Sequence, residues 1–317
     1  MSTTKDIKNV TIIGMGALGM LLGGLIEDRI GRENTVFLMD DGRYERNIRA
    51  VHKINGKRRD FRIVRASEAE KADLIIIAAK ATGLDEALVS MERAVGEDTV
   101  IISIINGITS EQFVAEKYGA DKVIHSVAQG MDAVCFNNEL TYRTPGTICL
   151  GIAPRFTGEE RRKMEEKLSS LAAFFEKTGV PYRLEEDIIR RQWSKFMLNC
   201  GCNQVCMVWD TGYGGMMEPE SEAFMAMTAA MREVVVLAHL EGIDLGENDV
   251  AEYLALMRTL QPDAMPSMEQ DRIRKKKTEV EIFAGTVKQL AKKHGIEVPA
   301  ADFLYRRIRE IEASYGC

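Results

Sequence analysis

The sequence predicts an α/β protein of two domains, a parallel-sheet domain followed by an all-helical domain. In the first half, short β-branched apolar runs alternate with helical patterns, which is typical of a sheet built from βα units. After residue 184 the strand-like runs stop and long helical patterns follow. A chain of 317 residues is long enough for both parts. We place the domains at 1–184 and 185–317.

The clearest pattern lies near the start of the chain. The apolar run Val10–Ile13 predicts a buried strand, and the run from Ala17 to Leu25 predicts a buried helix. Gly14, Gly16 and Gly19 follow the strand with the spacing G-x-G-x-x-G. This strand, turn and helix are the context in which the motif indicates a Rossmann-type dinucleotide site. The alternative is a tight βα turn in another kind of α/β protein.

Each glycine in the motif has a physical reason. Gly14 permits the tight turn, Gly16 lets a pyrophosphate approach the backbone, and Gly19 lets the helix pack on the strand. The phosphates would then lie on free N–H groups at the positive end of the helix. Ala17 and Leu18, in the first helical turn, complete the predicted phosphate site.

The second predicted strand, Thr35–Met39, is followed by residues of which some favour NAD and one favours NADP. Asp40 and Asp41 follow it directly, and an acid about 20 residues past the glycines is what binds the ribose of NAD. Arg43 lies just beyond and could instead bind the 2′-phosphate of NADP. A polar loop without a role is the remaining alternative.

Further strands and one long helix complete the predicted first domain. We predict a hairpin around Asn55-Gly56 that includes Phe61–Val64, strands at Asp73–Ala79, Thr99–Ile105, Lys122–Gln129 and Gly146–Ile152, a helix at Glu159–Thr178 and an edge strand at Val180–Leu184.

Two polar residues follow neighbouring buried strands. Lys80 comes after Asp73–Ala79, and Asn106 comes after Thr99–Ile105. Ligands of open α/β sheets bind outside the carboxyl ends of strands, so we expect both residues near a cofactor or substrate. Taken singly, each could be a surface lysine or a turn-forming Asn-Gly.

The second domain is predicted to be helical, and one of its helices carries polar side chains at regular spacing. We predict helices at Asp187–Cys206, Pro219–Glu241, Glu247–Leu260, Gln270–His294 and Ala300–Ser314. Lys195, Asn199 and Asn203 recur every four residues and so share one face of the first helix. They are either a polar site or a lysine reaching solvent beside two capping amides.

A second polar group lies later in the chain. Ser267 is a candidate N-cap, and Glu279 follows twelve residues later; taken alone, both suit a cap and an exposed helix face. The basic run 272–277 is flanked by acids and predicts a solvated helix face.

Composition narrows the class of protein further. A net charge of −6 gives no global field that would attract nucleic acid, and no apolar run approaches membrane-spanning length. The six cysteines form no C-x-x-C pair and histidines are few, so we expect neither a metal site nor a disulfide framework. Cys200, Cys202 and Cys206 suit small core residues. The N-terminus lacks an apolar signal segment, and we expect a reduced, cytoplasmic enzyme.

The motifs together resemble the ketopantoate reductase (2-dehydropantoate 2-reductase) family over nearly the whole chain. The matching pieces are the GMGALG loop, Lys80, Asn106-Gly107, W-x-K-F-x-x-N-C-x-x-N at Trp193–Asn203, S-M-x-Q-D at Ser267–Asp271, Thr278-Glu279 and Gly285. The resemblance implies a dinucleotide-binding domain and a helical domain with the active site between them, NADP(H) as cofactor, a small 2-keto acid as substrate, and a monomer or a homodimer.

The resemblance also implies roles for single residues. Lys195 would protonate the carbonyl oxygen of ketopantoate while hydride leaves the nicotinamide, giving D-pantoate. Glu279 would orient Lys195 or contact the substrate hydroxyl and lie near the cofactor. Asn199 and Asn203 would bind substrate oxygens, and Ser267 the substrate carboxylate. Lys80 and Asn106 would lie near the nicotinamide.

The chain departs from the family pattern at two places. Many relatives have an arginine directly after the second strand, where this chain has Asp40, so NAD(H) is a serious alternative to NADP(H). The stretch QVCMVW after Asn203 also lacks a proline often found there. The alternative function is an NAD-dependent D-2-hydroxyacid dehydrogenase acting on another branched 2-keto acid. A nucleotide sensor without catalysis is a third candidate, against which the predicted proton donor argues.

Overall fold

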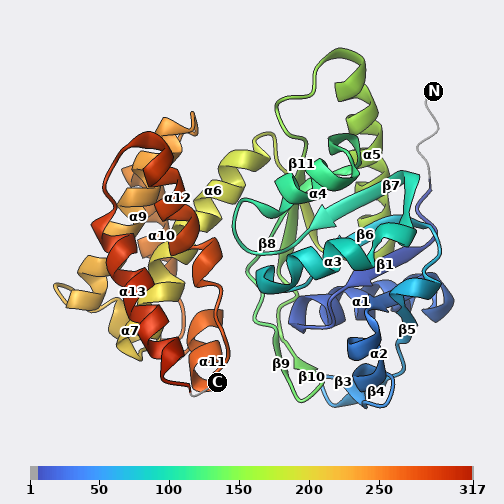
Figure 1. Cartoon of the computed structure of the whole chain (residues 1–317), viewed down its shortest axis with the longest axis horizontal. Helices are drawn as coiled ribbons and strands as arrows, with labels where there is room; N and C mark the ends of the chain where they lie inside the picture. Colours follow the sequence, from blue (N-terminus) through green and yellow to red (C-terminus); the bar gives the residue numbers. More distant parts are fainter. Residues whose placement is uncertain (1–5, 316–317) are drawn as a thin grey trace. The chain divides into compact units, whose positions relative to one another are not determined.

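The computed structural model describes residues 6–315 and divides them into two compact units, 6–191 and 192–315. The division falls within a helix, a few residues after the boundary predicted at 184/185. The first unit is mixed α/β and the second is helical, which confirms the predicted fold class (Figure 1).

A parallel sheet of five strands forms the centre of the first unit. The strands are β1 (Val10–Ile13), β2 (Thr35–Met39), β5 (Arg62–Arg65), β6 (Ala72–Ile77) and β7 (Val95–Ser103). Their order is β5-β2-β1-β6-β7, so the chain moves outward to one side of β1 and then returns to the other side. The strand order reverses between β1 and β6, which is where ligands of such sheets bind.

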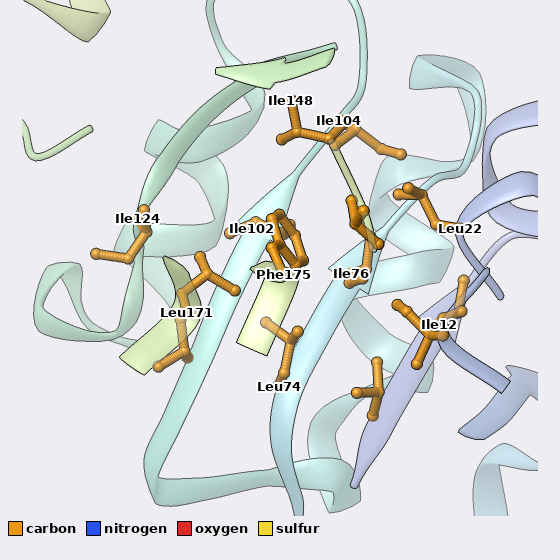
Figure 2. Packing of buried hydrophobic residues seen from close by; sticks show 14 of the residues in the cluster. Ile12, Leu22, Leu74, Ile76, Ile102, Ile104, Ile124, Ile148, Leu171 and Phe175 are labelled. Carbon is orange, nitrogen blue, oxygen red and sulfur yellow. The ribbon is translucent and has the colours of Figure 1, made fainter. Parts of the chain in front are cut away.

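Alternation along the strands gives the sheet an apolar core on each face, because successive side chains point to opposite sides. One core contains Ile12, Leu74, Ile76 and Ile102 from the strands. Leu22 from helix α1 (Ala17–Ile30) and Leu171 and Phe175 from helix α5 (Gly158–Thr178) pack against them (Figure 2). The other core contains Ile13, Ile75, Ile77 and Ile101 from the strands, with Leu84 and Leu88 from α3 (Leu84–Ser90) and Val114 from α4 (Ser110–Tyr118). Strands covered on both faces read as continuous apolar runs, which is how the sequence predicted them.

Helices of the first unit follow the strands. They are α1 (Ala17–Ile30), α2 (Asp41–Asn47), α3 (Leu84–Ser90), α4 (Ser110–Tyr118) and α5 (Gly158–Thr178). The predicted helix at Glu159–Thr178 is confirmed, and the predicted start at Ala17 is confirmed with a longer helix.

Two smaller sheets complete the first unit and correct one prediction. One sheet contains β4 (Lys57–Arg59), β3 (His52–Ile54), β10 (Glu139–Thr141) and β9 (Val134–Phe136) in that order, and the other contains β12 (Tyr182–Leu184), β11 (Thr147–Gly151) and β8 (His125–Gln129). Asn55-Gly56 does form a hairpin turn, but its second strand is β4. The segment predicted at Phe61–Val64 is instead β5, which pairs with β2 in the main sheet. The predicted edge position of Val180–Leu184 is confirmed for β12.

The second unit consists of helices. They are the end of α6 (Ile188–Leu198), a π-turn (Asn199–Asn203), α7 (Gln204–Trp209), α8 (Tyr213–Met216), α9 (Glu222–Leu240), α10 (Glu247–Met257), α11 (Ser267–Ile273), α12 (Ala284–His294) and α13 (Pro299–Ala313). The single helix predicted over Gln270–His294 is wrong. α11 ends at Ile273, Lys275 adopts a positive φ of 50°, and a 3-10 turn at Val280–Ile282 precedes α12.

One helix among the described residues has the length and composition to cross a membrane, although the sequence analysis expected none. It is α9, with a mean hydropathy of 1.4. Half of the stretch is buried within the protein, and a core helix meets the same criteria.

Candidate functional site

A corner formed entirely by backbone lies at the switch point of the sheet. Gly14 has φ of +103°, and a Cβ there would lie 2.6 Å from the carbonyl oxygen of Ala78, just after β6. A Cβ at Gly19 would lie 2.0 Å from the carbonyl oxygen of Gly14. Real Cβ atoms do not approach so closely, so the packing of this corner requires glycine at both positions.

Gly16 has no such reason to be glycine. Its φ of −86° suits any residue, and a Cβ there would meet no atom within 4 Å. It is the N-cap of α1, a helix of 14 residues whose N-terminus receives no side-chain cap; Ala17 and Leu18 follow, half-buried. The open space and the uncapped N–H groups fit a pyrophosphate that approaches the backbone closely.

Acidic and basic side chains meet at the end of β2. Asp40 caps α2, its Oδ1 accepting a hydrogen bond from the Arg43 amide at 2.9 Å, while its Oδ2 lies 3.5 Å from Nε of Arg43. The same guanidinium donates from Nη2 to Glu86 on α3 at 2.7 Å. Asp41 pairs separately with Arg65 at 2.8 Å. Arg43 is therefore already paired with two carboxylates.

Lys80 and Asn106 follow the two strands on the other side of the switch point. β6 and β7 pair in parallel, and the pairing continues past their ends, where the Ile104 amide donates to the Ile77 carbonyl at 2.9 Å. Lys80 is exposed and begins the 3-10 turn Ala81–Gly83. Asn106 is half-buried in the bend before α4. Both thus lie beyond carboxyl ends at one edge of the sheet, as predicted.

A buried polar network, which the sequence analysis missed, lies beside the Asn106 bend. Ser103 donates to the Ser110 hydroxyl at 2.8 Å, and the Ser110 hydroxyl donates to Glu111 at 2.9 Å. The Ser126 hydroxyl donates to the Ser103 carbonyl at 2.6 Å. Burial raises the pKa of Glu111, and the nearby His125 opposes this. The network ties the end of β7 to α4 and β8.

In the second unit, Lys195 lies on α6, half-buried. Asp187 directly precedes this helix and caps it by accepting a hydrogen bond from the Arg190 amide at 2.9 Å. Trp193 and Phe196 pack edge to face with ring centroids 5.9 Å apart, while Ser194 donates to the Tyr253 hydroxyl at 3.1 Å. The Ser194 bond joins α6 to α10 (Glu247–Met257) at the position directly before the lysine.

The predicted single helix over Asp187–Cys206 changes its winding at the two asparagines. Asn199–Asn203 form a π-turn, whose i→i+5 bonding needs more residues per turn. Gly201 lies in its middle, where a Cβ would come within 2.7 Å of the Met231 side chain and 3.0 Å of the Met227 carbonyl on α9. Both asparagines are buried, and Nδ2 of Asn199 has no hydrogen-bond partner among the described residues. π-turns occur frequently at functional sites.

The structure brings Ser267 to this turn, but not as an N-cap. Pro266 is the N-cap of α11, Ser267 is the first helical residue, and its side chain makes no capping bond. Instead Asn203 Nδ2 donates to the exposed Ser267 hydroxyl at 3.4 Å. Two predicted substrate residues separated by 64 positions are therefore in contact.

Glu279 and the basic run 272–277 do not lie on exposed helix faces, which is the simplest interpretation of their sequence. Glu279 is buried, with 7% of its surface exposed, and precedes the 3-10 turn, so it is not on an exposed helix face. The basic run is not one helix face either, because α11 ends at Ile273. Arg272 makes two hydrogen bonds to the fully buried Glu269, at 2.7 and 2.8 Å, and also pairs with Asp210.

The thiols near the π-turn are core groups. Burial raises the pKa of the Cys200 thiol, and a hydrogen bond with Cys206, together with burial, raises that of Cys202. Thiols held neutral in this way are poor nucleophiles and metal ligands. Within residues 6–315, no three His, Cys, Asp or Glu side chains are arranged to hold a metal ion.

Comparison with known proteins places the chain among its relatives. Family models of ketopantoate reductase PanE/ApbA match residues 10–152, and models of its C-terminal part match residues 187–312. The 2-dehydropantoate 2-reductase of Aquifex aeolicus is 26% identical over 215 residues, which are 65% of this chain and 66% of that protein. The chain spans about half to two thirds of the length of the curated relatives it matches.

Solved structures show the same fold. D-mandelate dehydrogenase with NADH and anilino(oxo)acetate superposes with a TM-score of 0.84 at 21% identity, covering 97% of this chain and 99% of that one. A dimeric ketopantoate reductase from Staphylococcus aureus superposes with a TM-score of 0.79 at 19% identity, covering 97% and 100%.

The strand order, the glycine corner and the helical second unit define a nucleotide-binding protein of the Rossmann class with an added helical domain. The two family matches then identify it further. The chain belongs to the ketopantoate reductase family, whose members are nicotinamide-dependent reductases.

Proposed function

We propose that this protein reduces 2-dehydropantoate to D-pantoate with a reduced nicotinamide cofactor, and that Lys195 is the general acid. The observation that carries the proposal is the polar group at the π-turn. Asn199 has a buried amide nitrogen without a partner, and Asn203 is bonded to Ser267. An unpaired buried amide costs about 1–3 kcal/mol, so an oxygen-rich ligand that accepts from it would be favoured.

Ketone reduction requires a hydride at the carbonyl carbon and a proton at the oxygen. The bound nicotinamide supplies the hydride. Lys195 supplies the proton from Nζ, and its positive charge stabilises the oxyanion as it forms. Asn199 and Asn203 donate hydrogen bonds to substrate oxygens, and Ser267 binds the carboxylate. Glu279 orients Lys195 or contacts the substrate hydroxyl.

The test of Lys195 is its replacement by alanine. Lys195→Ala should lower kcat by about 100-fold or more, the usual effect of losing a general acid, and leave the Kd of the cofactor unchanged. Lys276→Ala, which removes an exposed lysine of the same unit, is the control and should retain wild-type turnover. If Lys195→Ala also turned over like the wild type, Lys195 would not be the acid.

For the cofactor, the arrangement at β2 supports NADH. Arg43, the only cation suggested there for a 2′-phosphate, is paired with Asp40 and Glu86. A carboxylate keeps unused acceptor positions for the ribose hydroxyls but repels a phosphate. At 4 Å this repulsion costs about 1 kcal/mol even in water, which is about fivefold in affinity. We therefore expect the KM for NADPH to exceed that for NADH by at least about fivefold.

Asp40→Ser removes the negative charge of Asp40 but keeps its structural role. Serine also caps helices and would still accept the hydrogen bond from the Arg43 amide. It should narrow the difference in KM between NADPH and NADH. Asp41→Ser, at the neighbouring aspartate paired with Arg65, is the control and should change it little. A wild-type preference for NADPH would contradict this reasoning.

The same carboxylate favours a second candidate function, an NAD-dependent D-2-hydroxyacid dehydrogenase. Assays with 2-dehydropantoate and a panel of branched 2-keto acids, each with NADH and NADPH, separate the two. Cofactor binding without consumption on every keto acid would instead indicate a sensor. A cytoplasmic homodimer completes the proposal; for the assembly, the dimeric Staphylococcus aureus relative is the support.

A further inference from the structure

One side chain joins two segments of the second unit that carry the candidate substrate residues. Gln204 begins α7 directly after Asn203 and is only 1% exposed. Its Nε2 donates to the Cys200 carbonyl in the π-turn at 2.7 Å. Its Oε1 accepts from the Ala284 amide at 3.2 Å, at the start of α12. The link spans 80 positions of the chain.

The bond to the Ala284 amide supplies a partner that the local backbone lacks. The first N–H groups of any helix have no partner within it, and α12 receives no side-chain cap from its own N-cap, Phe283. Ala284 is fully buried, so water cannot easily replace the missing cap. Gln204 thus caps α12 from another helix while its amide hydrogens satisfy a carbonyl of the π-turn.

We propose that Gln204 is a positioning residue of the substrate site. It holds the π-turn, with Asn199 and Asn203, at a fixed distance from the segment that begins at Glu279 and ends at Ala284. The identity of the ligand rests on the proposed function, whereas the link itself does not. A keto acid that must contact both segments binds and reacts only if their spacing is fixed, since small misplacements reduce rate by large factors.

An apolar side chain of similar length would fill the same space without making either bond. A buried amide is costly unless its donor and acceptor are both satisfied, as they are here. A glutamine at a 1% exposed position is therefore explained by the two segments that its hydrogen bonds hold in place, and not by packing alone.

The experiment compares Gln204→Met, which keeps the volume and loses both bonds, with Gln204→Glu, which keeps the acceptor for the Ala284 amide. Ser221→Ala is the matched control, because it removes the N-cap of α9 in the same unit, where Ser221 accepts from the Phe224 amide at 3.1 Å. Two measurements are made on the full chain: hydrogen exchange of residues 279–287 without substrate, and KM and kcat for the keto acid that the wild type reduces.

Gln204→Met should speed exchange at Ala284 and lower kcat/KM for the keto acid by about 10- to 100-fold, with the cofactor Kd unchanged. Gln204→Glu should keep the exchange protection and recover part of kcat/KM. Ser221→Ala should lower stability without changing KM. Wild-type exchange or wild-type kcat/KM in Gln204→Met would overturn the proposal. A wild type that reduces no keto acid would refute the proposed function alone, because the exchange measurement still tests the link.

Discussion

Replacing Gly16 with alanine separates the binding of cofactor from the folding of the first unit. The added methyl group would meet no protein atom within 4 Å, and the backbone φ of −86° suits alanine. Alanine is a poorer N-cap than glycine, which destabilises the folded state by about 1 kcal/mol. Alanine also reduces the conformational entropy of the unfolded chain, which stabilises the folded state by about 0.4–1 kcal/mol. The two effects oppose each other, so the free energy of unfolding should change by less than about 1 kcal/mol.

Cofactor affinity should change much more. If a pyrophosphate lies against Gly16, the methyl group occupies space that the ligand needs. Overpacking of this kind costs about 1–3 kcal/mol, which corresponds to a Kd higher by about 5- to 150-fold. Fluorescence titration with the reduced nicotinamide cofactor measures the Kd, and urea unfolding measures stability.

Gly246→Ala is the matched control. Gly246 is also an N-cap, of α10, and a Cβ there also meets nothing within 4 Å. It should show a similar small change in stability and no change in Kd. Gly19→Ala should instead destabilise the first unit, because its Cβ would lie 2.0 Å from a carbonyl oxygen. A Gly16→Ala variant that binds cofactor like the wild type would refute this account of the glycine corner.

Two further predictions concern the first unit. Phe175→Ala should lower the free energy of unfolding by about 3–5 kcal/mol because Phe175 is fully buried, whereas Phe136→Ala, at a 61% exposed side chain, should change it by less than about 0.5 kcal/mol; urea unfolding measures both. Burial raises the pKa of Glu111 above 4.5, so the folded chain retains a proton that the unfolded chain releases. That stabilisation is complete below the unfolded pKa and is lost as pH rises through the folded pKa. Glu111→Gln should remove this part of the pH dependence of unfolding, measured from about pH 4 to about pH 8; a wild-type slope in the variant would contradict it.

The fold was largely predictable because its strands are covered on both faces. Val10–Ile13 and Thr35–Met39 read as short, continuous apolar runs, and both have the predicted bounds. The segment at Phe61–Val64 was misplaced because a turn signal at Asn55-Gly56 specifies a hairpin but not which later strand closes it. The helix break after Ile273 was missed because lysines and arginines are good helix formers, and the positive φ of Lys275 leaves no mark in the sequence.

The candidate site was predictable where residue spacing alone determines position. Spacing predicted Lys195, Asn199 and Asn203 on one face of a single helix; in the structure Lys195 lies on α6, and the two asparagines lie in the π-turn directly after it. The contact between Asn203 and Ser267 and the pairing of Arg43 with Glu86 join residues far apart in the chain, which no local pattern reports. Ser267 looked like an N-cap because serine before a helix usually is one, yet Pro266 takes that position. Gly201 within a helical pattern was the available signal for the π-turn.

The π-turn has a consequence for how this segment tolerates insertions and deletions. A turn bonded i→i+5 accommodates one residue more than a turn of α-helix, so the residues after Asn203 are rotated by about 100° from their phase in an uninterrupted helix. Loss of a single residue between Asn199 and Asn203 would let the segment rewind as an α-helix. The two changes of about 100° cancel, so Gln204 and the rest of α7 would keep their neighbours. A deletion of one residue, which would rotate everything that follows it in a regular helix, would therefore be absorbed at this turn as it is in a loop.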